Sequence, residues 1–353
     1  MVEAVPVPVP VQAWGRRLSD ALRAALESGD LAAARRLALE GDGQARSLAK
    51  EYSLMYRGLG ITIRVLLPLL RETAARADTS KGAAAAFEAA TLVHRFRSGL
   101  AGRMRDIWGE PAPSSEPPGT LDEEIARTAL VLAAGEARFE REQARLAEEI
   151  VRAIEAGEVA RTRTLLDVKE QGQYVPLHDR LIRFMAESFG WVLRWFGPGE
   201  LLRFHLATAE GQRPGFEKWE QMSAAEFARA SVFLLKQHMG QVAVREDGEK
   251  FTIEQALCGS GGRLRLAGAY AGADALPFVE ERGPLTLGQA RFPVYCSHCP
   301  IWNGVAPVEW FGRPHWVFEE PARPDGGCTL HVYKRRDGAP AVYLDQLRRP
   351  SRA

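Results

Sequence analysis

An eleven-residue stretch that no helix or strand can cross divides this chain of 353 residues. It runs from Gly109 to Gly119 and contains four prolines, each lacking the backbone donor that a helix or a central strand requires. Residues 12–108, on its N-terminal side, are rich in Ala, Leu, Arg and Glu, a composition typical of packed helices. We therefore expect a helical bundle over 12–108 and a linker over 109–119.

The segment after the linker, residues 120–240, resembles a second copy of the first. Thr120 can cap a helix whose first turn is acidic, and we expect this helix to run to about Ala156. Near its end, Ala153 to Val159 matches Ala25 to Leu31, and each match is followed by a similar amphipathic pattern. These observations predict a duplicated helical bundle.

The sequence pattern changes near Gln241. Short alternating runs at 241–245, 250–254 and 329–333 are typical of strands, and Gly, Pro and aromatic residues separate them. We predict a small, cysteine-rich α+β domain over 241–353 with a mostly antiparallel sheet. The predicted fold class for the whole chain is α+β, with duplicated helical bundles before this domain.

Composition limits the partners and the compartment. A formal net charge of +1, without a basic run interleaved with aromatic residues, argues against a nucleic-acid partner. The N-terminus lacks the features of a signal peptide, and Arg64 and Pro68 interrupt the longest apolar stretch, so we expect no membrane span. The default expectation is a cytoplasmic, bacterial-type protein. In such a reducing compartment a Cys-x-x-Cys pair indicates metal binding or redox chemistry.

All four cysteines fall within the predicted C-terminal domain: Cys258, Cys296, Cys299 and Cys328. The two-residue gap between Cys296 and Cys299 lets both sulfurs turn toward one ion, and zinc sites commonly combine such a turn with two distant ligands. Strand alternation points Cys296 and Cys328 toward the domain core. We predict that the four thiolates bind zinc. Two alternatives stay open: buried reduced thiols that act as small apolar side chains, and a nucleophilic or redox cysteine.

This order of residues resembles the L-2-amino-thiazoline-4-carboxylate hydrolase-like proteins over about residues 241–335. The resemblance lies in a strand that ends at Cys258, a segment that carries Cys296, and the closing strand Gly326-Gly327-Cys328-Thr329-Leu330-His331-Val332. It implies hydrolytic opening of a small sulfur heterocycle. Cys299 and the glycine-rich loop after Cys258 have no counterpart in that pattern.

Two histidines are candidate proton carriers. His178 begins an apolar stripe that faces the bundle interior, and its members are His178, Ile182, Met185, Phe189 and Val192. A buried imidazole needs a partner, which could be a backbone carbonyl, a substrate or a metal. Asp179 falls on the polar side of the helix, so we do not expect it to orient His178. His238 lies at a predicted helix end closed by Gly240.

Two other histidines flank the cysteines. His298 could replace one thiolate, but we expect it to lie outside the ligand set. His331 alternates with Leu330 and Val332, and we expect it to be exposed on the sheet.

The loop after Cys258 is a candidate substrate-binding segment. It consists of Gly259, Ser260, Gly261, Gly262 and Arg263. Successive backbone N–H groups in such a loop can form a nest for an anion, and Arg263 would add positive charge. A carboxylate is a better fit than a nucleotide, because the loop matches no phosphate-binding motif. A plain hairpin turn is the alternative.

These observations predict a zinc-binding hydrolase of a small, anionic carboxylate or of a sulfur- or nitrogen-containing molecule. Zinc held by four thiolates would be structural, whereas zinc held by three would keep an open position for water. One alternative is a non-catalytic ligand or metal sensor with structural zinc, whose helical segments serve a homodimer. The other is a metal-free enzyme with Cys258 as nucleophile.

Overall fold

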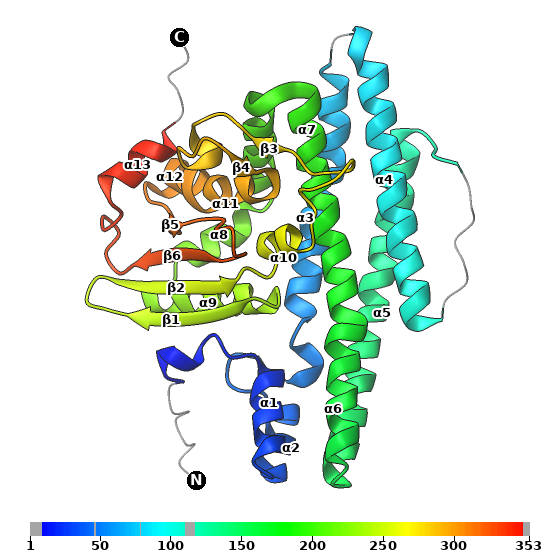
Figure 1. The fold of residues 1–353 in the computed structure, drawn as a ribbon, viewed down its shortest axis with the longest axis vertical. Coiled ribbons are helices and arrows are strands. Elements are labelled where there is room, and N and C mark those ends of the chain that lie inside the picture. The colour runs from blue at the N-terminus through cyan, green and yellow to red at the C-terminus, as the bar shows by residue number, and fades with distance from the viewer. Residues whose placement is uncertain (1–8, 46, 78, 110–116, 349–353) are drawn as a thin grey trace.

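Long helices and a small sheet form the two parts of the protein (Figure 1). The computed structural model describes residues 9–45, 47–77, 79–109 and 117–348. Four long helices stand side by side along the longest axis, and the sheet with its short helices lies against one flank of them. The predicted α+β fold class is confirmed.

The long helices come from both sides of the predicted linker. They are α3 (Ser53–Ala75), α4 (Thr79–Trp108), α5 (Leu121–Glu155) and α7 (Val175–Glu210). Tyr56 of α3 stacks on Phe139 of α5 at 4.2 Å, and Phe96 of α4 stacks on Phe184 of α7 at 4.0 Å between ring centroids. The long helices of 12–108 and 120–240 therefore share one core and do not form two separate bundles. A second, smaller apolar cluster joins Leu18 and Leu22 to Ile150 and Leu166.

The predicted start of α5 is confirmed in detail. The hydroxyl of Thr120 accepts from the N–H of Glu123, whose carboxylate in turn accepts from the N–H of Thr120 at 2.8 Å. This reciprocal pairing satisfies two donors that the first turn of a helix leaves without partners. Of the predicted linker, residues 110–116 lie outside the described residues.

The repeated sequence corresponds to one repeated turn. Gly29 lies between α1 (Leu18–Glu27) and α2 (Leu31–Glu40), and Gly157 lies between α5 and α6 (Val159–Asp167). Both glycines adopt positive φ angles, 76° and 71°, which end a helix without a steric penalty. The sequence similarity that predicted a duplication therefore corresponds to two helices that end with the same kind of glycine turn.

One helical stretch, Leu48–Ala75, is long and apolar enough to cross a bilayer by length and composition alone, although 56% of its most apolar window is buried inside the protein. Buried side chains on this stretch, such as Ile63 and Leu66, pack into the shared core.

The sheet is four-stranded and antiparallel throughout, in the order β1-β2-β6-β5, as the alternating runs predicted. Its strands are β1 (Gln241–Glu246), β2 (Lys250–Leu257), β5 (Val317–Glu320) and β6 (Cys328–Tyr333). A two-stranded ribbon joins β3 (Phe278–Val279) to β4 (Phe292–Pro293). The short helices are α8 (Arg213–Glu220), α9 (Ala224–Gln237), α10 (Gly261–Leu266), α11 (His298–Pro300), α12 (Ala306–Phe311) and α13 (Ala341–Leu347).

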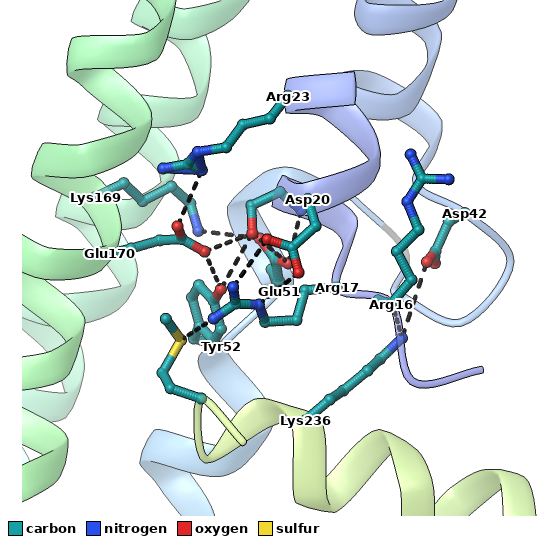
Figure 2. Close-up of polar contacts among 12 residues, drawn as sticks. Arg16, Arg17, Asp20, Arg23, Asp42, Glu51, Tyr52, Lys169, Glu170 and Lys236 are labelled. Carbon is teal, nitrogen blue, oxygen red and sulfur yellow. Dashed lines mark hydrogen bonds and ion pairs between the residues drawn. The ribbon is translucent and has the colours of Figure 1, made fainter. Parts of the chain in front are cut away.

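A π-helical segment, Val168–Tyr174, joins α6 to α7 and carries two fully buried charged residues. Lys169 and Glu170 face Glu51, which is also buried, from the chain just before α3 (Figure 2). π-Helical turns are rare and occur often at functional sites.

Hydrogen bonds to the two carboxylates hold this network together. Glu170 accepts short hydrogen bonds from the hydroxyls of Tyr52 and Ser19, and its other oxygen pairs with Arg23 at 3.1 Å. Glu51 accepts from the backbone N–H of Ser19 at 2.9 Å.

The ammonium of Lys169 neutralises this site. Its Nζ lies 3.7 Å from Glu51 Oε2 and 4.5 Å from the centroid of the Tyr52 ring. Burial lowers the pKa of Lys169, against the attraction of Glu51, and raises the pKa of Glu51. The network ties α1 to the π-helical segment and to the start of α3.

We predict that Lys169→Met lowers the free energy of unfolding by about 3–5 kcal/mol, because it leaves two carboxylates buried with one cation fewer. Adding Glu51→Gln should recover part of this loss. The exposed pair Arg35–Glu155 provides the control, since Arg35→Met should cost at most about 1 kcal/mol. Urea unfolding of the four proteins measures these values, and equal losses in the two single variants would contradict the prediction.

Candidate functional site

A cavity of about 530 Å³ lies between the long helices and the sheet, and all four cysteines line it. Its walls come from α3, α8, α9, one face of the sheet and the segment from β4 to residue 303. The polar side chains in the lining include Thr62, Gln212, His238, Gln255, Cys258, Ser260, Arg265, Cys296, His298, Cys299, Asn303 and Cys328. The sequence patterns indicated the four cysteines, His238, His298 and Ser260 among them, but not the apolar residues that form most of the wall.

The two candidate histidines meet. His178 Nε2 lies 2.8 Å from His238 Nδ1, and His178 Nδ1 lies 2.9 Å from Asp179 Oδ1. The predicted stripe of α7 is buried as expected, with His178 fully buried. The expectation that Asp179 does not orient His178 is wrong, because its carboxylate reaches back to the ring of the preceding residue.

The hydrogen bonds assign the protons along this relay. The Asp179 carboxylate only accepts, so Nδ1 of neutral His178 donates to it and Nε2 of His178 accepts from His238. The proton of His238 is then on Nδ1, which leaves a lone pair on Nε2. Since His238 lines the cavity, the relay places an imidazole base at the cavity wall.

Burial keeps both histidines neutral. It lowers the pKa of His178, although Asp179 opposes the shift. It lowers the pKa of His238 well below the ordinary value, and the charges of His178 and His298 add to this effect. Burial acts to raise the pKa of Asp179, but hydrogen bonds from His178 and Arg263 outweigh it and lower that pKa. The relay thus has a carboxylate at one end and an available base at the other.

Arg263 belongs to this relay. Its Nη2 lies 2.6 Å from Asp179 Oδ2, and its Nε lies 3.3 Å from Oδ1. We expected Arg263 to attract a substrate anion, but its charge is already matched by Asp179. No sequence motif signals this pair, because 84 residues separate its members.

The glycines of the predicted nest allow close packing. A Cβ at Gly259 would lie 2.0 Å from the carbonyl oxygen of His238, and one at Gly262 would lie 2.1 Å from that of Gly326. At Gly261 it would lie 2.8 Å from Cys296 Sγ, and Ser260 lines the cavity. Gly259 therefore brings the Cys258 loop against the end of α9, Gly262 brings it against the chain before β6, and Gly261 brings it against Cys296.

The sequence predicted that Gly240 ends α9, but the residue with the left-handed conformation comes one position earlier. His238 is the C-cap residue, and Met239 adopts the left-handed conformation with φ 64° before Gly240. Arg17 Nη1 contacts Met239 Sδ at 3.1 Å (Figure 2). This conformation is strained for a non-glycine residue, so the contacts around Met239 must maintain it. The backbone at the end of α9 therefore has a defined path, and this path positions His238.

Tyr174 connects the charge network to the relay. Its ring stacks on Tyr52 at 4.2 Å and lies 5.5 Å from the ring of His178. Its hydroxyl donates to the carbonyl oxygen of Gln237 at 2.5 Å, next to His238. Tyr174 therefore lies against the ring of His178 and also holds Gln237, the residue that precedes His238.

The Cys296–Cys299 turn also contains an imidazole with an assigned proton. His298 Nδ1 donates to the carbonyl oxygen of Tyr295, and its Nε2 lies 3.4 Å from Cys299 Sγ. Burial lowers the pKa of His298 to about 4 and raises the pKa of Cys299 well above its ordinary range. This pair is a neutral thiol beside a neutral imidazole.

The other thiols share the same surroundings. Cys296 Sγ lies 3.1 Å from Arg265 Nη1, and Cys258 Sγ lies 3.6 Å from Ser260 Oγ. Burial raises the pKa of Cys296 to about 12 despite Arg265, and it raises the pKa of Cys328 further. All four thiols are unpaired. Among the residues that the structure describes, no group of three or more Cys, His, Asp or Glu side chains is arranged to hold a metal ion.

Two further histidines are buried. His331, expected to be exposed, is 4% exposed and bonds to Thr252 at 3.1 Å, because β6 lies inside the sheet. His205 of α7 lies 2.9 Å from Ser297 Oγ, and this contact fixes the cysteine turn to the long helix.

Comparison with known proteins finds no matching family model, no matching curated protein and no matching solved structure.

We predict that the protein loses stability on mild acidification. Burial lowers the pKa of His205 well below the ordinary value, so below about pH 6.5 the unfolded chain binds a proton that the folded chain does not. The loss is about 1.4 kcal/mol per pH unit for each histidine that stays neutral. Urea unfolding at pH 7, 6 and 5 measures it. His205→Gln should reduce the slope between pH 6 and 5 by about one histidine's share, and an unchanged slope would contradict this assignment.

Proposed function

We propose that the protein is a hydrolase of a small molecule that binds in the 530 Å³ cavity. One observation carries the proposal: the relay of Asp179, His178 and His238 ends at the cavity wall beside the thiols. An imidazole with a fixed tautomer, an orienting partner and access to a cavity is the arrangement that general-base catalysis requires.

In this proposal His238 Nε2 takes a proton from water as the water oxygen attacks the electrophilic carbon. The proton then passes from His238 to the leaving nitrogen or sulfur, so that the base is regenerated. Protonated His238 would be stabilised through His178 by the negative charge of Asp179. Burial lowers the pKa of His238, which keeps it unprotonated at neutral pH, and the charge of Asp179 acts in the opposite direction by favouring the protonated form that the reaction requires.

The resemblance of residues 241–335 to L-2-amino-thiazoline-4-carboxylate hydrolase-like proteins supports the same reaction class. A sulfur heterocycle with a carboxylate is small enough for the cavity. The four unpaired thiols also support the proposal of a reducing, cytoplasmic location.

The activity test uses p-nitrophenyl esters and 2-amino-thiazoline-4-carboxylate. We expect His238→Gln to lower kcat/KM about 10²–10⁴-fold, because it removes the base, and Asp179→Asn to lower it less. His315→Gln is the matched control, since His315 is a buried histidine outside the cavity lining. Retained activity in His238→Gln would refute the role of the base, and loss only in Cys258→Ser would favour the metal-free thiol nucleophile.

Zinc is the second candidate, because the four thiols line one cavity, and Cys258 and Cys296 lie near enough for their charges to add to the effect of burial, which raises the pKa values of Cys299 and Cys328. This proposal asks Cys258, Cys296, Cys299 and Cys328 to converge on one ion. We predict one equivalent of zinc in protein purified without added metal, and its loss from each Cys→Ser variant. Elemental analysis measures it. Metal-free, folded wild-type protein would contradict zinc, and binding without turnover would favour the sensor.

A further inference from the structure

Most of the cavity lining is apolar. Aromatic side chains form much of its wall: Phe216, Trp219, Phe292, Tyr295, Trp302, Trp316 and Phe318. Among the lining residues that the structure describes, Arg265 is the only one that carries a permanent charge.

Arg265 has no carboxylate partner within ion-pair distance among the described residues. Its Nη1 contacts Cys296 Sγ at 3.1 Å, and its Nη2 contacts the carbonyl oxygen of Arg323 at 3.2 Å. Its Nε is buried without a hydrogen-bond partner in the described structure. Asp325, an acid near enough to feel its charge, is exposed and pairs with Arg323 instead.

Arg263, two residues earlier, provides the contrast, because Asp179 neutralises it. A guanidinium in apolar surroundings attracts an anion strongly, since the low dielectric weakens solvent screening. Carboxylates match the guanidinium fork through two parallel hydrogen bonds.

Part of the lining reaches the surface on α3. Leu54 and Ile61 line the cavity and are 59% and 46% exposed. They give the cavity an apolar rim.

We propose that the cavity binds an amphipathic monoanion, with its carboxylate on Arg265 beside Cys296 and its hydrocarbon body along the aromatic wall toward Leu54 and Ile61. A volume of about 530 Å³ suits a chain of medium length or an aromatic acid. The inference names the substrate class for the proposed hydrolase, and its catalytic meaning rests on that proposal.

Isothermal titration of the full chain with butanoate, hexanoate, octanoate and 1-octanol tests the proposal. We expect affinity to rise about three- to fourfold per methylene along the acids, because each one is removed from water. Octanoate should bind at least about tenfold more tightly than 1-octanol, as expected for a charge-assisted contact in an apolar site. Equal affinities for octanoate and 1-octanol, or for butanoate and octanoate, would overturn it.

Variants locate the anion. Arg265→Gln should abolish the preference for octanoate over 1-octanol, and Arg265→Lys should retain it. Arg245→Gln, on the exposed side of β1, is the matched control and should bind as wild type. Since 1-octanol still reports on the apolar wall, a folded Arg265→Gln protein is recognised by its retained binding of the alcohol. A preference that persists in Arg265→Gln would refute the proposal.

These results are separable from the hydrolase proposal. Octanoate binding with no turnover of any ester would contradict only the proposal that the protein is a hydrolase. Turnover without a preference for anionic ligands would contradict only the proposal that Arg265 binds a carboxylate.

Discussion

The hydrogen bond between His178 and His238 joins the two parts of the molecule. His178 belongs to α7, whereas His238 lies at the junction between α9 and the first strand. Around this bond, the Cys258 loop passes against the carbonyl oxygen of His238, and Arg263 from that loop reaches Asp179. The arrangement of the cavity therefore depends on two rings that are 60 residues apart in sequence.

Exclusion of water determines the chemistry available at this junction. Burial shifts imidazoles and thiols toward their neutral forms, so the cavity has bases and unionised sulfurs but few charges. The exception in the lining is Arg265, which has no acid partner among the described residues. Asp179 and Arg263 form an ion pair behind His178, outside the lining. Few charges in an apolar enclosure can act strongly on a bound molecule, because water screens them little.

The sequence predicted the features that depend on local order. The capped start at Thr120, the buried stripe that begins at His178 and the antiparallel strands all follow from spacing along the chain. His178 and His238 were each candidate proton carriers, but no local pattern predicted that their rings pair. Asp179 was misjudged, because helical periodicity describes faces of a helix and not a side chain that folds back on its neighbour. Arg265 and the shared helical core depend on distant contacts that no local pattern encodes.

The π-helical segment Val168–Tyr174 has a consequence for how this chain can tolerate change in length. A π turn accommodates one residue more than an α turn, and each helical residue rotates the face by about 100°. Lys169 faces Glu51 while His178, nine positions later on the continuous helix, faces the sheet. Deletion of a single residue here would rotate the face that carries Lys169 by about 100° relative to the face that carries His178. The number of residues from 168 to 178 therefore sets the angle between the two buried polar sites along the helix. The length of this segment matters as much as its side chains.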